Sequence, residues 1–141
     1  MKSQIPTELI DEYRATEYRI GDGPERFTLR IGCRSDALAG LFRETNRPYA
    51  LFITAYNPFS ETQSEEENQL ANESLLKELL RLVGSVTAGI GINPAGVWPG
   101  EPGFLALGMD GEAARALGTE YRQNAVVWAD DDAVPQLVLL R

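Results

Sequence analysis

The segment YALFITA, residues 49–55, decides the fold that this chain is expected to adopt. It is a nearly continuous run of apolar, β-branched and aromatic residues, which is typical of a strand covered on both faces. A turn-forming sequence, NPFS, follows it, and Ser64 with Glu67 three positions later forms a capping box. We therefore predict a central strand that leads through a turn into a long helix over residues 65–83.

Apolar residues in this helix recur at the spacing of one helical face, which predicts that the helix packs against the sheet. The stripe has Asn72 at its head and continues through Leu75, Leu76, Leu79, Leu80 and Val83. The glutamates of the first turn complement the positive end of the helix dipole. We expect this helix to be the main core element.

On the N-terminal side of the central strand, the pattern predicts a short helix, a hairpin and a second helix. Thr7 is expected to cap the short covering helix, with Pro6 at its entry. Residues 16–21 and 27–32 alternate around a Gly- and Pro-containing turn, and Ser35 caps the second helix. The single cysteine, Cys33, follows the hairpin. A lone cysteine favours a small buried apolar residue over a reactive thiol.

On the C-terminal side, strands alternate with a small helix that Asp110 caps. The expected segments are a glycine-containing strand or strand edge at 86–92, a Pro- and Gly-rich loop at 93–103, and strands at 104–109, 124–129 and 136–140. The resulting order, αββαβαββαββ, predicts an α+β fold with helices packed on a mixed, largely antiparallel sheet. Because no linker or internal repeat interrupts it, we expect one domain over residues 1–141.

Composition narrows the classes of function. The chain has 141 residues, of which 43% are hydrophobic, and a formal net charge of −8. This charge disfavours sequence-independent binding to nucleic acid or to an anionic membrane surface. No apolar run approaches the ~18 residues of a membrane span, and the N-terminal sequence lacks the basic and apolar regions of a signal peptide. We expect a cytoplasmic protein.

The chain contains no histidine and only one cysteine, which removes several mechanisms. There is no imidazole for a Ser-His-Asp or Cys-His relay, and no histidine ligand for zinc or haem. The run Asp130–Asp132 lacks the spaced ligands of a calcium loop and is typical of a solvated turn. The sequence therefore predicts no metal site and identifies no cofactor.

The strongest candidate for a ligand site is the junction between the central strand and the long helix, residues 54–60. Ligands bind preferentially at strand ends and helix N-termini. Asn57, Ser60 and Asn68 would supply uncharged donors and acceptors there. The alternative is that these residues only cap the helix and turn the chain, which their chemistry equally explains.

Two other segments carry side chains suited to a site. In the Pro- and Gly-rich loop, Trp98 and Glu101 would set an aromatic wall beside a carboxylate. The other segment directly precedes an apolar strand and consists of Tyr121, Arg122, Gln123 and Asn124. The alternatives are a loop anchored by its tryptophan and an ordinary strand entry. We predict that Asn57, Glu101 and Gln123 converge at the C-terminal end of the central strand.

Four segments carry a family resemblance: FITAYNPFS, SEEENQLANESLL, VWPGEPGFLALG and YRQNAVVW. Together they resemble the uncharacterised bacterial family called domain of unknown function 3293, from about Tyr13 to Val127. Two positions depart from its pattern: Gly103 stands where Ser is expected, and Tyr121-Arg122 where Phe-Gly is usual. The positions that match are Thr54, Ala55, Tyr56, Asn57, Pro58, Ser60, Ser64, Asn68, Trp98, Glu101, Pro102, Gln123 and Ala125.

The resemblance implies a grouping but no activity, so two hypotheses stay open. The first is a pocket for a small polar, nucleotide-like metabolite, lined by Asn57, Ser60, Asn68, Trp98, Glu101 and Gln123. If the protein is an enzyme, Glu101 is the candidate general base. The second is an acidic module that presents a negative face to a basic protein partner without catalysis.

Overall fold

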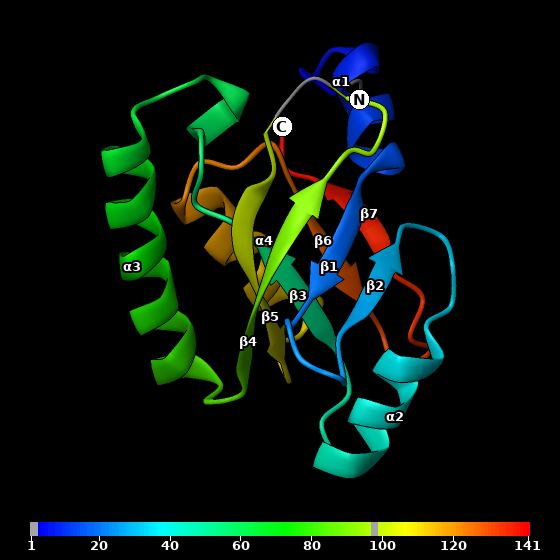
Figure 1. Ribbon diagram of the computed structural model, residues 1–141. Coiled ribbons are helices and arrows are strands. Elements are labelled where there is room, and N and C mark those ends of the chain that lie inside the picture. Colours follow the sequence, from blue (N-terminus) through cyan, green and yellow to red (C-terminus); the bar gives the residue numbers. More distant parts are fainter. Residues whose placement is uncertain (1–2, 97–98) are drawn as a thin grey trace.

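The computed structural model describes residues 3–96 and 99–141, and its elements follow the expected order (Figure 1). The predicted α+β fold is confirmed: helices pack on one seven-stranded sheet with strand order β2-β1-β4-β5-β3-β6-β7. Every pair of neighbouring strands in this sheet is antiparallel, so the sheet is not mixed. The strands are β1 (Glu17–Ile20), β2 (Phe27–Arg30), β3 (Ala50–Ile53), β4 (Val86–Ile92), β5 (Glu101–Leu107), β6 (Ala125–Ala129) and β7 (Gln136–Leu139).

Four α-helices and one short 3-10 helix are present in the described residues. Ser35, Ser64 and Asp110 cap their helices through side-chain hydrogen bonds, and the predicted capping box of Ser64 and Glu67 is formed. The helices are α1 (Thr7–Ala15), α2 (Asp36–Thr45), η1 (Pro58–Ser60), α3 (Glu65–Leu82) and α4 (Gly111–Glu120). The cap expected at Thr7 is wrong, because Pro6 is the N-cap of α1 and no side chain caps this helix.

The sheet curls so that its two edges approach each other at one end. The Gly32 N–H donates to Pro135 O (2.8 Å), and the Ser35 N–H donates to Ala133 O (2.9 Å). These bonds join the chain after β2 to the loop before β7, the strands at opposite edges of the sheet. The curl gives the sheet a convex and a concave face, and each face holds its own core cluster.

On the convex face, α3 and α4 cover the sheet (Figure 1). Leu51 and Ile53 of β3 pack there against Leu75 and Leu79 of α3, and all four side chains are at most 1% exposed. The stripe on α3 is narrower than predicted, because Leu76 is only half-buried and Leu80 is 50% exposed. The side chains that α3 buries are Asn68, Asn72, Leu75 and Leu79.

On the concave face, α2 and α1 lie at opposite ends of the sheet (Figure 1). Leu38 and Phe42 of α2 pack against the inward side chains of the strands, including Ile20, Phe52 and Leu105. By contrast, α1 buries none of its own residues. This end of the concave face is therefore left without an apolar filling.

The glycines of β4 have a role that the sequence pattern did not indicate. A strand edge was one expectation, but β4 lies between β1 and β5 in the interior of the sheet. A Cβ at Gly89 would lie 2.7 Å from Arg19 O, and one at Gly103 of β5 would lie 2.9 Å from Phe52 Cζ. Both positions lack a side chain because the neighbouring backbone and the Phe52 ring occupy that space.

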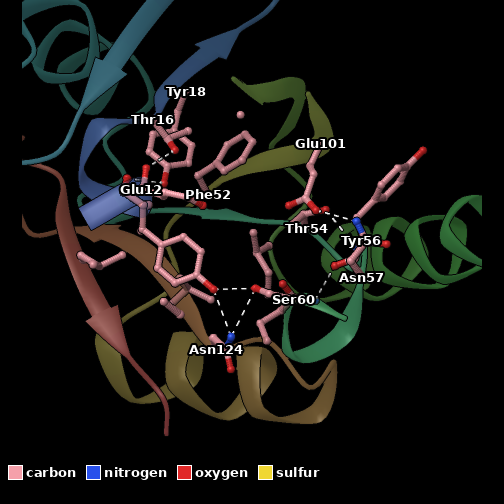
Figure 2. A pocket seen from close by; sticks show the side chains of 18 of the residues that line it. Glu12, Thr16, Tyr18, Phe52, Thr54, Tyr56, Asn57, Ser60, Glu101 and Asn124 are labelled. Atoms are coloured by element: carbon pink, nitrogen blue, oxygen red, sulfur yellow. Dashed lines mark hydrogen bonds between the residues drawn. The ribbon is translucent and has the colours of Figure 1, made fainter. Parts of the chain in front are cut away.

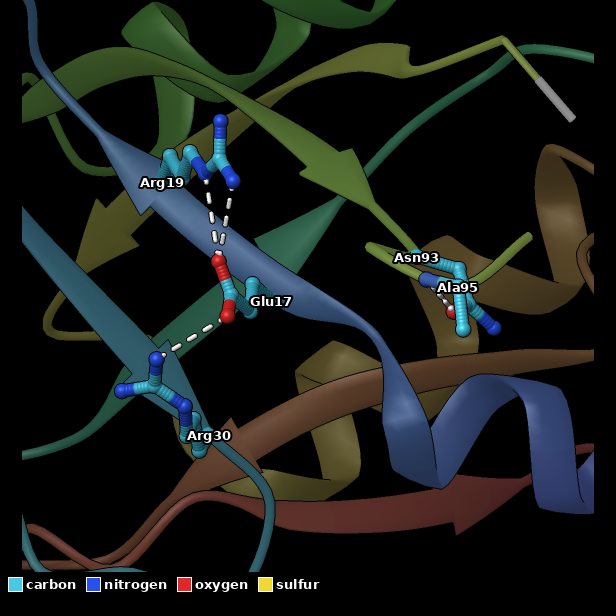
Figure 3. Close-up of polar contacts among 5 residues, drawn as sticks. All are labelled: Glu17, Arg19, Arg30, Asn93 and Ala95. Atoms are coloured by element: carbon cyan, nitrogen blue, oxygen red, sulfur yellow. Dashed lines mark hydrogen bonds and ion pairs between the residues drawn. The ribbon is translucent and has the colours of Figure 1, made fainter. Parts of the chain in front are cut away.

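Two further expectations are corrected. Strand β5 begins at Glu101 rather than at residue 104, because Glu101 and Pro102 already pair with Gly91 and Ile90 of β4. Cys33 is exposed, not buried, because the chain turns away from the sheet after β2. Beside it, the exposed face of the hairpin carries an ion cluster in which Glu17 lies between Arg19 and Arg30 (Figure 3).

Candidate functional site

A cavity of about 350 Å³ lies under α1, where the concave face lacks an apolar filling (Figure 2). Its wall combines residues of α1, the inner face of the sheet, the turn after β3 and the entries to β5 and β6. The lining residues are Leu9, Glu12, Tyr13, Thr16, Tyr18, Phe52, Ile53, Thr54, Tyr56, Asn57, Ser60, Gly91, Asn93, Pro99, Glu101, Gln123, Asn124, Ala125, Val126, Val127 and Leu137. The size is within the usual range of small-molecule sites.

The turn after β3 is held in place by an asparagine pair. The Asn57 N–H donates to Asn68 Oδ1 (2.8 Å), and Asn68 Nδ2 donates to Asn57 Oδ1 (3.0 Å). Gln63 adds its N–H to Asn57 Oδ1 and its Nε2 to Asn68 Oδ1. Because Asn68 is 3% exposed and bonded on both sides of its amide, it fixes the position of Asn57 rigidly.

The same turn stores backbone strain. Asn57, Phe59 and Ser60 have φ values of 45°, 56° and 60°. Such left-handed φ values are uncommon for side chains other than glycine, and surrounding structure must hold them. Here the Phe59 N–H donates to the carbonyl of Arg122 (2.7 Å), which is itself at a φ of 54°. Of these residues, Asn57 and Ser60 line the cavity.

A second asparagine joins the turn to the start of β5. Asn72 Oδ1 accepts the Ala55 N–H (2.8 Å), while Asn72 Nδ2 donates to Pro102 O (2.9 Å). The Thr54 hydroxyl donates to the same carbonyl at 2.7 Å. These bonds hold residue 102 against the end of β3, so the preceding residue, Glu101, lies beside Asn57.

Glu101 is the most perturbed acid of the cavity wall. Asn57 Nδ2 donates to its Oε2 at 2.8 Å, and no described residue bonds the other oxygen, Oε1. Burial raises the pKa of the Glu101 carboxyl above its usual range, and the Asn57 hydrogen bond opposes this only in part. No Lys or Arg lies among the described lining residues. Among the described residues of this wall, the carboxylate is therefore a hydrogen-bond acceptor without a cationic partner.

Aromatic side chains form the apolar part of the wall. The rings of Tyr18 and Phe52 pack at a tilt, with their centroids 5.2 Å apart. Burial, together with a hydrogen bond to Glu65 (2.6 Å), raises the pKa of Tyr56 to about 12. Burial also raises the pKa of Tyr18. These phenols stay protonated at neutral pH and present rings, not charges, to the cavity.

A separate part of the wall, where Figure 2 labels Ser60 and Asn124, holds a hydroxyl–amide cluster of these two residues and Tyr13. The two hydroxyl oxygens are 2.6 Å apart, and Asn124 Nδ2 donates to Tyr13 Oη (3.0 Å) and to Ser60 Oγ (3.2 Å). Behind the cluster, Arg141 Nη1 donates to Asn124 Oδ1 (3.0 Å), and its guanidinium lies 4.1 Å from the centre of the Phe59 ring. The cluster joins α1 to the strained turn.

The structure brings four of the six candidate ligand residues into this one wall: Asn57, Ser60, Glu101 and Gln123. Gln123 is tied down, because its Nε2 donates to Tyr56 O and Tyr121 O, both at 3.3 Å. Asn68 does not line the cavity but lies behind Asn57. Trp98 lies outside the described residues.

Of the third candidate segment, Gln123 and Asn124 line the cavity. Sequence reasoning did not select Tyr13, Tyr18 or Phe52 as site residues, although all three line it. The pattern marked Tyr13 and Tyr18 only as apolar positions of a covering helix and of a hairpin. Tyr13 is 47 positions from Ser60 and 111 from Asn124. No local signal in the sequence links positions so far apart.

The described residues contain no metal-binding cluster and no membrane-spanning helix. No group of three or more acidic or cysteine side chains there could hold a metal ion, and no helix there is long and apolar enough to cross a membrane. In the run Asp130–Asp132, the carboxylates of Asp130 and Asp132 accept backbone N–H groups of their own turn. This run is a turn, as predicted.

Comparison with known proteins adds the family. The model of a family described as "Protein of unknown function (DUF3293)" matches residues 53–126, which confirms the resemblance drawn from the sequence. The match begins at the end of β3, later than the Tyr13 expected. No curated protein and no solved structure matches this chain.

The two departures from the family pattern have structural counterparts. A Ser at position 103 would place its Cβ 2.7 Å from Ile53 O, so the glycine here fits the Phe52 ring and the neighbouring strand. At position 122, where Gly is usual in the pattern, Arg122 has a φ of 54°. That is a conformation which glycine adopts freely and other residues adopt with strain.

Proposed function

We propose that this chain, which belongs to the family of proteins of unknown function DUF3293, binds a small polar metabolite in the cavity under α1. The ligand presents an N–H-bearing group, amino or cationic, to the Glu101 carboxylate. One observation carries the proposal: a half-buried carboxylate lies in an aromatic wall with one neutral hydrogen-bond donor and no cation among the described lining residues.

Burying a carboxylate without a counter-charge is unfavourable, and proteins accept this where a ligand completes the site. Asn57 uses its other polar atoms on Asn68 and Gln63, so it holds Glu101 in one orientation. The strained turn that presents Asn57 supports the same proposal, because strain of this kind clusters at functional sites.

A nucleoside-like ligand suits this wall. Its amino-bearing ring would pair with Glu101, and its face would pack on Tyr18 and Phe52. A phosphate group does not suit it, because Glu12 and Glu101 line the cavity and no described lining residue is basic. We therefore favour a nucleoside or free base over a nucleotide. If the ligand reacts, Glu101 is the group positioned to take its proton.

The test is a thermal-shift screen of nucleosides, free bases, amino acids and amines. A ligand at a hundredfold its Kd stabilises the folded state by about 2.7 kcal/mol, which raises Tm by roughly 5–10 °C in a protein of this size. Glu101→Gln should abolish the shift, and Glu112→Gln, which changes an exposed carboxyl on α4, should leave it intact. A panel without a shift would contradict the proposal.

A second function, an acidic surface for a basic protein partner, draws on the charge distribution. Residues 51–141 hold 13 acidic and five basic side chains, whereas residues 1–50 hold eight of each. The exposed leucines Leu70, Leu80 and Leu82 all lie on α3, whose first turn is acidic. Retention of a partner that falls steeply between low and moderate salt would support this function.

A further inference from the structure

The hydroxyl–amide cluster of Tyr13, Ser60 and Asn124 has more hydrogens than its own contacts use. The Asn124 amide and the two hydroxyls carry four polar hydrogens in all. The three contacts among them use at most three of these hydrogens. At least one hydrogen therefore has no partner within the cluster, and all three side chains line the cavity.

The orientation of the Asn124 amide is fixed by Arg141. A guanidinium only donates hydrogen bonds, so the atom that it contacts at 3.0 Å must be the amide oxygen. The amide nitrogen then points to the two hydroxyls. Asn124 is 4% exposed, and its carbonyl is polarised by a cation, which strengthens its N–H groups as donors. The cluster is therefore a preorganised donor, in which the amide is buried, Tyr13 is half-buried and Ser60 is exposed.

Glu101 has the opposite character, since an ionised carboxylate only accepts hydrogen bonds. Figure 2 shows Glu101 with Asn57 in one part of the wall and Ser60 with Asn124 in another. One cavity thus offers an acceptor and, separately, a donor. A ligand that satisfies both must carry a donor group and an oxygen acceptor.

Resting on the function proposed above, we propose that the cluster of Tyr13, Ser60 and Asn124 binds a carbonyl oxygen of the same ligand whose amino group pairs with Glu101. The ligand class is an amino compound that also carries a carbonyl. Two sources share this chemistry: a purine such as guanosine, and an amino-acid amide. Neither source is distinguished by the wall alone, so the experiment contains an arm for each.

In each arm, one compound lacks the carbonyl group together with the N–H of the adjacent nitrogen, so the variants below assign the difference to the carbonyl oxygen. Guanosine is compared with 2-aminopurine riboside, and phenylalaninamide with phenethylamine, by calorimetric titration of the full chain. In at least one arm, the carbonyl compound should bind about tenfold more tightly than its partner. Ser60→Ala and Tyr13→Phe should reduce that ratio to about twofold or less, mainly by weakening binding of the carbonyl compound.

The chain offers a matched control in a second hydroxyl pair. The Ser74 and Tyr121 hydroxyls are 3.1 Å apart, and neither residue lines the cavity. Ser74→Ala and Tyr121→Phe should leave the ratio unchanged. Because Ser60 has a φ of 60°, Ser60→Gly removes the hydroxyl at a position that favours glycine, and it serves if Ser60→Ala folds poorly.

Three outcomes would overturn the inference. Equal affinities for the two compounds of each pair would show that the cluster does not bind the carbonyl oxygen. A ratio that survives Ser60→Gly and Tyr13→Phe would place the carbonyl elsewhere. In both cases, binding that still depends on Glu101 leaves the proposed function standing. If no compound of the wider screen binds, both the inference and the proposed function fail.

Discussion

The two faces of the curled sheet are built from different chemistry. The convex face is closed by aliphatic side chains of β3 and α3 that are almost wholly buried. The α1 end of the concave face is held instead by amide and hydroxyl hydrogen bonds, left-handed backbone and one desolvated carboxylate. The first arrangement stabilises the fold without a ligand, whereas the second holds polar groups in place at some expense of stability.

Helix α3 contributes to both regions, the apolar core of the convex face and the polar network beside the cavity. Its second half places Leu75 and Leu79 in the convex core. Its first half places Asn68 and Asn72 against the backbone of residues 55 and 57, beside the cavity. Because the same helix is packed into the apolar core, the asparagines of its first half hold the turn that carries Asn57 in a fixed position.

The largest expected effect is in the convex core. Leu79→Ala should lower the free energy of unfolding by about 2–5 kcal/mol, because Leu79 is fully buried and its removal leaves a cavity. Leu76→Ala is the matched control and should cost clearly less, since Leu76 is only half-buried. Urea denaturation measures both. Equal losses would mean that the helix buries the wider stripe predicted from the sequence.

The next effect is in the polar network. Asn68→Ala should lower the free energy of unfolding by about 1–3 kcal/mol, because the buried Asn57 N–H and the Gln63 amide lose their acceptor. It should also abolish the ligand-dependent thermal shift, because Asn57 no longer orients Glu101. Gln69→Ala, the neighbouring exposed position on α3, is the control. Retention of the full thermal shift by Asn68→Ala would separate the asparagine pair from the site.

Glu101→Gln should stabilise the folded protein slightly, and the size of this effect should depend on pH. The pKa of Glu101 is raised in the folded state above its ordinary 4.5. At a pH between this ordinary value and the raised pKa, the native protein therefore binds more protons than the unfolded chain. The free energy of unfolding then falls as the pH rises from 4.5 through the raised pKa of Glu101. Glu101→Gln removes this loss, so the variant should have a Tm up to a few degrees above the parent at pH 8 and an equal Tm below pH 4.

Melting curves at both pH values decide this prediction. A large fall in Tm at pH 8 would make Glu101 a structural anchor of the entry to β5 rather than a ligand group.

Cys33→Ser should have almost no effect. Cys33 is exposed and lies apart from both core clusters, so stability should change by no more than about 0.5 kcal/mol. Ligand binding should also stay unchanged. The measurement is a melting curve with and without ligand, and a loss of the ligand-dependent shift would extend the functional region to the end of the β1–β2 hairpin.

The elements of the fold were predictable because their signals are local. Ser35, Ser64 and Asp110 each accept a hydrogen bond from the backbone N–H three residues later. The apolar run of β3 is likewise one continuous segment of the sequence. The narrower stripe on α3 was not predictable, since spacing alone cannot show where a helix lies on a curved sheet.

The site was predictable only where residues flank strand ends. Asn57, Glu101 and Gln123 each stand at such a position, and all three line the cavity. Tyr13 takes part through contacts over 47 and 111 positions, which the sheet order and the position of α1 create. Asn68 has the residue type expected of a ligand contact, but the helix turns it toward the backbone of Asn57.

The curl of the sheet also bears on self-association. Exposed edge strands present unpaired backbone groups that other copies of a chain can extend. Here both edge strands, β2 and β7, have four residues, and the chain segments beside them are joined by backbone hydrogen bonds. Arg30 ends β2 as part of an ion cluster (Figure 3). Short edges with a charged end resist the addition of further strands, so the curl that leaves room for the cavity also disfavours fibrous aggregation.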